Sequence, residues 1–442
     1  MLTALPTIAA AASALRRGAL RPLDLVEFCL SRIERFEPRV HAWVLVDAAG
    51  ARAEALRQEA MLRAGQDPGP LAGIPLGIKD IIDVAGWPTR GGSTLRDGHV
   101  AHRDATLVGR LREAGAIILG KTVTAQFACF DPPLTRNPWN EAHTPGGSSS
   151  GSAAAVAMEM CMAAIGTQTG GSIIRPASYC GVVGLKPSWG QVPLDGVIPV
   201  SYHLDHAGPL ARCVGDAAAV YAQLRQSGCQ PVDPRPAEIE RWSTAGAPPL
   251  QALDNFFFNQ ASPPVQAATR AGLQRLPVDW GTQPLGRLPN SFGESWAEHR
   301  RIMAVEAAEV HRRQYAEQPA AYGPHISGLL DTGLMTSAVD YAASLRFQRE
   351  FQRDIARMFD SMGIAVMPAT NCTAPGWQTT GDPKFNSPWS LAGVPSITIP
   401  GGLTEDGLPW GLQLVGPHHG ETQLIQAAAW CERHFDCHLR PV

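Results

Sequence analysis

Apolar residues recur along the chain with two different patterns, which separate expected helices from expected strands. A spacing of three to four residues predicts amphipathic helices. The segments with this spacing are 8–17, 22–36, 48–64, 104–114, 215–227, 294–317, 337–359 and 420–434. Short apolar runs bounded by turn residues predict strands. These runs are 42–47, 71–83, 116–121, 181–186, 364–368, 394–400 and 408–415.

Helices and strands alternate over much of this length, which is typical of α/β architecture. We therefore expect one large α/β domain over residues 1–442, with a mixed central β-sheet flanked by helices. Residues 229–292 have little periodicity and are rich in proline. We expect this variable middle to consist of surface loops and short helices.

Composition excludes several classes of protein. The 442 residues are 45% hydrophobic and 17% charged, as in a globular chain, and the net charge of −3 indicates no nucleic-acid or membrane-surface binding. No apolar run has transmembrane length, and the N-terminus is apolar first and basic after, the reverse of a secretory signal. The nine cysteines include no Cys-x-x-Cys pair, which argues against disulfides and zinc. We expect a cytoplasmic protein without a metal.

Lysine is rare among the basic residues. Of 37 basic residues, 33 are arginine and four are lysine, at Lys79, Lys121, Lys186 and Lys384. A buried ammonium group can lose its proton, whereas a guanidinium group stays charged. Lys79 lies inside an apolar run, where it is either a structural lysine paired with a nearby Asp or a neutral base. Asp80 and Asp83 are the candidate partners for the structural reading.

Two clusters of glycine and serine, at 146–152 and 170–172, flank an Ala-rich run that predicts a helix. Glycine allows backbone N–H groups to approach a ligand closely, and serine supplies hydroxyl groups. A flexible linker is also rich in these residues, but it would not continue into a long apolar stretch. The pattern therefore indicates a segment with a chemical role.

Other catalytic motifs do not fit. The segment 147–151 matches G-x-S-x-G, yet no apolar strand precedes it as the hydrolase elbow requires. S-x-x-K, H-E-x-x-H and the P-loop pattern are absent from the sequence. The histidines without ligand spacing or a base motif are His102, His143, His203 and His206. What remains is a lysine and two glycine loops that carry serine.

These segments resemble the amidase signature family. The resemblance covers nearly the whole chain and is strongest over a signature core at 69–193. It continues in Asn386-Ser-Pro-Trp-Ser-Leu-Ala-Gly-Val-Pro-Ser and in Gly407-Leu-Pro-Trp-Gly-Leu-Gln-Leu-Val-Gly. The resemblance implies an amidase fold and a Ser–Ser–Lys catalytic triad.

The resemblance assigns each triad member to one position. Lys79 in GIPLGIKD matches the family's lysine, Ser148 in PGGSSSGSAAAVA matches its middle serine, and Ser172 in GTQTGGSIIRP matches its nucleophile. It also implies a cis peptide bond before Ser148 and a proton relay through that serine. The backbone N–H groups implied to bind the oxyanion are those of Thr169, Gly170, Gly171 and Ser172. This chemistry is reasonable, because a serine nucleophile needs a base and a desolvated lysine can be neutral at about pH 7–8.

The chain departs from the family at two positions. Gln168 stands where the family commonly has Asp, and Ile174 where it commonly has Arg. An arginine, Arg175, follows one residue after that position. The family's Asp and Arg can pair, so the loss of both leaves no lone buried charge. We therefore expect a subgroup with a neutral loop, not an inactive scaffold.

The expected activity is cofactor-free hydrolysis of amide C–N bonds through an acyl-enzyme on Ser172. Esters and carbamates present the same kind of carbonyl and stay open as substrates. Substrate choice is expected to lie in 127–134, the variable middle and 378–390. The residues expected to contact substrate are Phe127, Phe130, Gln168, Phe385 and Trp389, although the rings among them can equally belong to the core.

The alternative function is that of the A subunit of a glutamyl-tRNA amidotransferase, which acts within a partner complex. The missing arginine at position 174 and the short segment from Cys129 to Arg136 argue against it. For a hydrolase, the expected partner is a small-molecule amide, ester or carbamate. No nucleic-acid or membrane partner is expected, and a homodimer is allowed.

Overall fold

The computed structural model describes residues 2–226, 236–280, 286–435, 437 and 439–441. Within these residues, ten strands form one mixed sheet in the order β1-β3-β2-β4-β6-β5-β9-β10-β8-β7. The strands are β1 (Trp43–Val46), β2 (Pro75–Lys79), β3 (Ile117–Thr122), β4 (Ala163–Gln168), β5 (Val183–Lys186), β6 (His206–Ala211), β7 (Leu250–Ala252), β8 (Ile364–Pro368), β9 (Ser396–Leu403) and β10 (Pro409–Val415). The expected α/β class with a mixed central sheet is confirmed.

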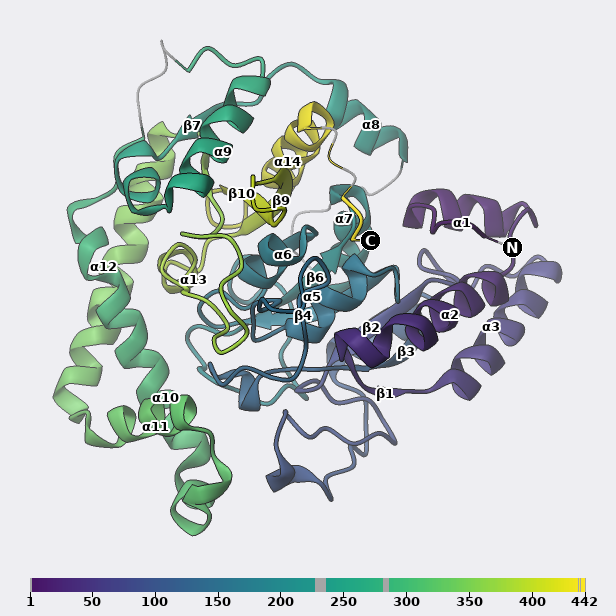
Figure 1. Ribbon diagram of the computed structural model, residues 1–442, viewed down its shortest axis with the longest axis horizontal. Helices are drawn as coiled ribbons and strands as arrows, with labels where there is room; N and C mark the ends of the chain where they lie inside the picture. The colour runs from purple at the N-terminus through teal and green to yellow at the C-terminus, as the bar shows by residue number, and fades with distance from the viewer. Residues whose placement is uncertain (1, 227–235, 281–285, 436, 438, 442) are drawn as a thin grey trace.

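Helices flank the sheet (Figure 1). The α-helices of the described ranges are α1 (Ile8–Arg16), α2 (Pro22–Val40), α3 (Ala48–Arg63), α4 (Thr106–Glu113), α5 (Ser150–Ala157), α6 (Ile174–Cys180), α7 (Val214–Leu224), α8 (Pro236–Thr244), α9 (Pro263–Arg275), α10 (Ser295–Glu317), α11 (Pro324–Met335), α12 (Ala338–Ser361), α13 (Ser387–Leu391) and α14 (Glu421–Phe435). In Figure 1 the N-terminal helices α1–α3 lie at one end of the molecule and α10–α12 at the other.

The long helices follow the expected apolar spacing. In α12, for example, Phe351, Ile355, Met358 and Phe359 are buried, at intervals of four, three and one. Burial of one face stabilises such a helix more than its intrinsic propensity does. The described part of the variable middle contains α8, β7 and α9, whereas its residues 229–235 and 281–285 lie outside the described residues.

Two central strands were not expected from the sequence. β4 follows α5 within a stretch that is apolar except for Glu159, so no change of period marks the boundary between helix and strand. β6 contains Gly208 and Pro209, which are rare inside strands. Gly208 is required there because a Cβ atom would lie 2.1 Å from the carbonyl oxygen of Leu185.

The pairing of β2 with β4 brings Lys79 close to the loop that carries Ser172. The two strands are parallel, with Ile78 opposite Ile165, so their carboxyl ends meet at one edge of the sheet. Ligand sites in open α/β sheets commonly lie beyond the carboxyl ends of the strands. Lys79 ends β2 and Gln168 ends β4, so Lys79 and the loop 170–172 that follows β4 lie at this edge.

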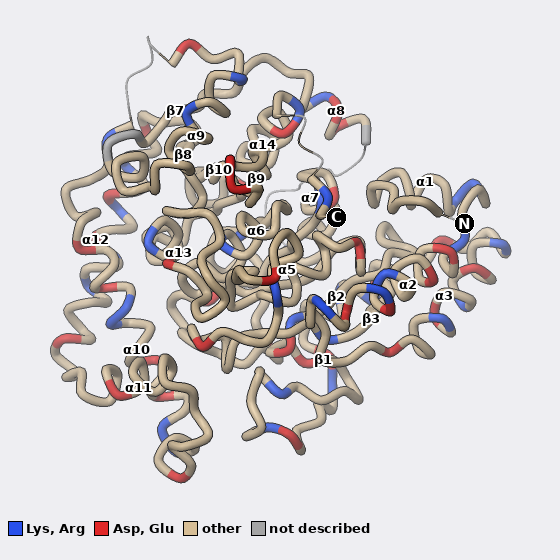
Figure 2. Tube along the Cα trace, in the orientation of Figure 1, with Lys and Arg blue, Asp and Glu red and all other residues tan. Residues whose placement is uncertain are grey.

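Most charged residues lie on the outer helices, such as α2, α3 and α12 (Figure 2). Three of the four lysines are exceptions, because Lys79, Lys121 and Lys186 have no exposed surface. None of the helices in the described ranges is long and apolar enough to cross a membrane.

Candidate active site

Lys79 points from the end of β2 toward the first glycine loop. Its Nζ lies 2.7 Å from Ser148 Oγ and 2.8 Å from Thr167 Oγ1. Within the described part of the chain, Lys79 forms no ion pair. Burial lowers the pKa of Lys79 from its ordinary value of 10.5 to about 7, although the nearby charge of Asp205 acts in the opposite direction. The amine can therefore be neutral near physiological pH.

The observed ion pairs do not agree with a structural role for Lys79 as the partner of Asp80. Asp80 pairs with Lys121, whose Nζ is 2.8 Å from Asp80 Oδ1, and both side chains are buried. Lys121 also donates to the carbonyl oxygen of Pro88 and to Thr89 Oγ1. The second lysine thus has the structural role that the sequence left open for the first.

Ser148 lies in a tightly held loop before α5. The peptide bond between Gly147 and Ser148 is cis, as the family resemblance implies. Arg175 Nη2 donates a hydrogen bond of 2.7 Å to the carbonyl oxygen of Gly147, and Ser150 Oγ donates one of 2.6 Å to that of Gly146. These contacts hold the backbone that leads into the cis bond.

The expectation of a neutral loop is wrong, because Arg175 brings its charge to the site from one position later. Its guanidinium is fully buried. Burial lowers the pKa of Arg175, but a guanidinium group keeps its proton at neutral pH. Gln168 has a separate role: its Oε1 accepts from the N–H groups of Ile173 and Ile174, at 2.9 and 3.1 Å. The amide thus satisfies two N–H groups at the start of α6, which have no partner within the helix.

The loop that carries Ser172 is fixed through its carbonyl oxygens. That of Thr169 accepts from His299 Nε2 at 2.9 Å, and that of Gly170 from Ser390 Oγ at 3.0 Å. Backbone N–H groups bind the other two: Arg175 N binds the oxygen of Gly171, and Ser149 N binds that of Ser172.

The N–H groups of the same loop have a different status. Those of Gly170, Gly171 and Ser172 have no acceptor in the described ranges. The side chain of Thr169 donates to Asp205 at 2.5 Å, and burial raises the pKa of Asp205 to about 6. The loop therefore offers free N–H donors whose direction is set by the bonds on its opposite side.

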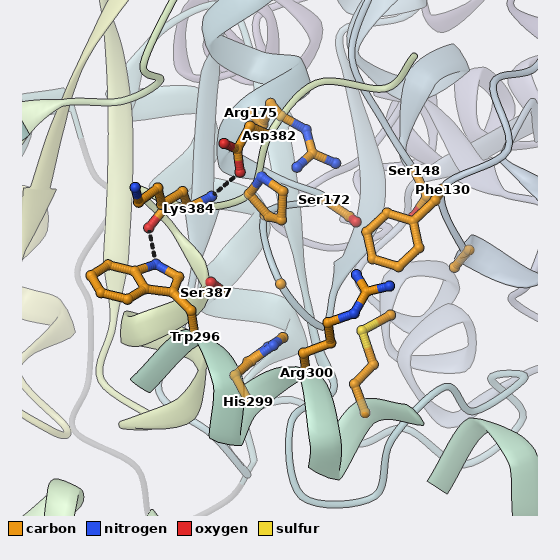
Figure 3. A pocket seen from close by; sticks show the side chains of 15 residues that line it. Phe130, Ser148, Ser172, Arg175, Trp296, His299, Arg300, Asp382, Lys384 and Ser387 are labelled. Atoms are coloured by element: carbon orange, nitrogen blue, oxygen red, sulfur yellow. Dashed lines mark hydrogen bonds between the residues drawn. The ribbon is translucent and has the colours of Figure 1, made fainter. Parts of the chain in front are cut away.

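A pocket of about 340 Å³ contains both Ser148 and Ser172 in its wall (Figure 3). The other lining residues are Ala128, Phe130, Gly170, Gly171, Arg175, Trp296, His299, Arg300, Met303, Asp382, Pro383, Lys384 and Ser387. Ser148 and Ser172 are only 2% and 8% exposed, so a carbonyl group bound there would be shielded from water. Such a volume suits a small organic molecule.

The residues expected to contact substrate divide into two groups. Phe130 lines the pocket, whereas Phe127, Phe385, Trp389 and Gln168 are absent from its lining. The side chain of Phe127 is buried, and its ring centroid lies 4.4 Å from that of His311. The rings of Phe385 and Trp389 pack on Phe257, at 5.1 and 5.9 Å between centroids.

Sequence reasoning missed the contribution of α10. Trp296, His299, Arg300 and Met303 line the pocket with the spacing of one helix face. The helix was expected, but nothing local to it indicates which distant loop its face covers. Burial lowers the pKa of His299 to about 4, so the ring is neutral at pH 7. The histidines named from the sequence, at 102, 143, 203 and 206, are absent from the lining.

Comparisons with known proteins agree with this architecture. A family model described as Amidase matches residues 24–425. The A subunit of the glutamyl-tRNA(Gln) amidotransferase of Roseiflexus castenholzii is 35% identical, over 98% of this chain and 96% of its own.

Solved structures are similar over the same span. One, described as an unexpected vestigial protein complex that reveals the evolutionary origins of an s-triazine catabolic enzyme, has a TM-score of 0.89 and 28% identity, over 97% of this chain and 98% of its own. The native peptide amidase of Stenotrophomonas maltophilia has a TM-score of 0.82 and 31% identity, over 99% of both chains. Since the family match and these similarities extend over nearly the whole chain, the protein belongs to the amidase signature family of hydrolases.

Proposed function

We propose that this protein hydrolyses amide C–N bonds through an acyl-enzyme on Ser172, with Lys79 as the base and Ser148 as the proton relay. One observation carries the proposal: a fully buried lysine without a carboxylate partner in the described residues lies 2.7 Å from a serine hydroxyl in the pocket wall. Lys121, in contrast, pairs with Asp80. The buried Lys186 also has no carboxylate partner in the described residues, but its Nζ donates to the carbonyl oxygens of Pro187 and Val394 and not to a hydroxyl group of the pocket. A lysine held neutral by burial is suited to accept a proton.

The reaction begins when Ser172 Oγ attacks the carbonyl carbon of the substrate. The proton of Ser172 passes to Ser148 Oγ while the proton of Ser148 passes to Lys79 Nζ. The tetrahedral intermediate then expels the amine, which takes a proton back along the same relay. Water attacks the acyl-enzyme in the second half, releases the carboxylic acid and restores the proton to Ser172.

Charge develops on the carbonyl oxygen during both halves of this reaction. The unpaired N–H groups of Gly170, Gly171 and Ser172 support a role as oxyanion donors, because their directions are set before substrate binds. Thr169 was included from the family resemblance and is kept in the proposal. Loss of one such donor typically costs a factor of about 10²–10³ in rate.

A fluorophosphonate probe tests the nucleophile. Such a probe phosphonylates an activated serine, so intact-mass spectrometry of the wild type should show one adduct and peptide mapping should place it on Ser172. Ser172→Ala should take up no probe and hydrolyse no substrate, with an unchanged circular dichroism spectrum. Labelling of Ser148 or Ser149 would show that the assigned nucleophile is wrong.

The A subunit of an amidotransferase is the second candidate function, because a protein of that name is 35% identical to this chain. The two proposals differ in their need for partners. The purified chain should hydrolyse simple aryl amides by itself if it is a hydrolase. Activity that appears only on glutamine, and only when the partner proteins are supplied, would favour the amidotransferase. Parallel assays of amides, esters and carbamates would then define the preferred leaving group.

A further inference from the structure

The lining of the pocket that contains Ser172 has more cationic than anionic side chains. Arg175, Arg300 and Lys384 line it, and Asp382 is the one carboxylate in its described lining. His299 adds no charge, since its ring is neutral above about pH 4. A neutral amide offers these cations a hydrogen-bond acceptor but no opposite charge.

Arg300 is the cation most available to a ligand. Figure 3 shows its side chain rising from α10 with the guanidinium directed toward Ser172 and Phe130. Its Cζ lies 5.9 Å from the centroid of the Phe130 ring, and it has no ion pair among the described residues. The next residue differs: Arg301 is absent from the pocket lining and pairs with Glu298 at 2.6 Å.

Arg175 adds a second, buried source of positive charge. One of its nitrogens, Nη2, donates to Gly147, but Nε and Nη1 have no partner in the described part of the chain. A buried guanidinium without a counter-ion is costly, and an anion in the pocket would reduce that cost. The nearby Asp382 interacts with Arg175 by charge but forms no ion pair with it in the described residues.

Lys384 is the third cation in the lining of the pocket. Its Nζ lies 5.6 Å from the ring centroid of Trp296 and 5.7 Å from that of Phe256. These aromatic faces hold the ammonium in place without neutralising it. Asp382 partly opposes the field, and its Oδ1 accepts from the backbone N–H of Lys384 at 2.9 Å.

We propose that the substrate is an anionic amide whose carboxylate binds to the guanidinium of Arg300, with Arg175 and Lys384 providing further attraction. This inference rests on the proposed function and names the substrate class of the same pocket. A guanidinium group binds a carboxylate through two parallel hydrogen bonds, which gives orientation as well as affinity. Arg300 would thus be a specificity-determining residue outside the catalytic triad.

Matched amides test the proposal. Succinamate and butyramide have similar lengths and differ in a terminal carboxylate on the acyl side. The pair 4-acetamidobenzoate and acetanilide places the carboxylate on the amine side. In the pair whose carboxylate is on the side that reaches Arg300, we expect wild-type kcat/KM to be higher for the anionic amide by about tenfold or more. This factor is equivalent to about 1.4 kcal/mol. The preference should shrink as ionic strength rises.

Arg300→Met should abolish most of that preference, because it should lower kcat/KM for the anionic amide more than for its neutral partner. Arg313→Met is the matched control, because it removes the same charge from the same helix at a side chain that is 93% exposed. It should keep the wild-type preference. If neither pair shows a preference that Arg300→Met removes, the inference is overturned.

A second measurement separates this inference from the proposed function. The rate at which a fluorophosphonate labels Ser172 needs no turnover of an amide, and bound substrate slows it. Protection by an anionic amide but not by its neutral partner supports the inference, even where hydrolysis is slow. Equal protection, or hydrolysis of neutral amides alone, overturns the inference and leaves the proposed function standing. Failure of Ser172 to react at all overturns both.

Discussion

Replacement of Lys79 by arginine separates a base from a structural cation. The pKa of Lys79 falls from 10.5 to about 7, which corresponds to about 5 kcal/mol at 1.36 kcal/mol per unit. This is the approximate cost of holding a charge at that position. Arginine keeps its charge at all working pH values. Lys79→Arg should therefore remove the base and also place in the site a cation that cannot lose its proton.

The predicted result is a fall in kcat/KM of about 10²–10⁴, the usual contribution of a general base, for Lys79→Arg and Lys79→Ala alike. The assay is steady-state hydrolysis of the best amide, after circular dichroism and melting curves show that the variants are folded. Lys121→Arg is the control, because its partner Asp80 can pair with either cation. If folded Lys79→Arg keeps more than about a tenth of wild-type kcat/KM, a loss of under about 1.4 kcal/mol, the proposed triad must be abandoned.

The same pKa predicts the pH dependence of activity and of stability. Activity requires the neutral amine, so kcat/KM should rise through about pH 7 and level off at alkaline pH. The unfolded chain binds this proton below about pH 10.5, whereas the folded protein binds it only below about pH 7. Burial of Lys79 therefore lowers the free energy of unfolding in a pH-dependent way: the effect is absent above pH 10.5, grows as the pH falls and is complete below pH 7. In Lys79→Met, the free energy of unfolding should depend less on pH between these values.

The remaining predictions concern the loop that carries Ser172, two histidines outside the pocket lining and the side chain of Gln168. His299→Phe removes the hydrogen bond to the carbonyl oxygen of Thr169. Steady-state kinetics should show a kcat lowered by about tenfold or more, with a smaller change in KM. An unchanged kcat would exclude a positioning role for His299. His102 and His143 are absent from the pocket lining, and their replacement should leave kcat/KM within about tenfold. Gln168→Leu leaves the buried N–H groups of Ile173 and Ile174 unpaired. The free energy of unfolding, measured with urea, should fall by about 1–3 kcal/mol for each group. A value within about 0.5 kcal/mol of wild type would contradict this account.

Local pattern was sufficient for much of the fold. The long amphipathic helices α10 and α12 and the strands β8 and β10 appear close to their expected bounds, because each carries its own period or apolar run. The strands β4 and β6 were missed for the opposite reason. They are buried on all sides, so neither alternates in polarity, and Pro209 in β6 argues against a strand until its neighbours are known.

The sequence by itself determined which residues to consider at the site. Lys79, Ser148 and Ser172 stand in local motifs long enough to be recognised, and the rarity of lysine singled out the first of them. Their assembly depends on the parallel pairing of β2 with β4, which only the tertiary structure decides.

Tertiary structure also decided which of several similar residues serve the pocket. Asp80 pairs with Lys121 and not with its chain neighbour Lys79, and Arg300 rather than Arg301 faces the ligand space. Aromatic residues expected at the pocket, such as Trp389, fill the core instead. These outcomes depend on contacts between segments separated by tens to hundreds of residues. Local periodicity specifies which face of an element is apolar, but burial and pairing are set by the element that packs against it.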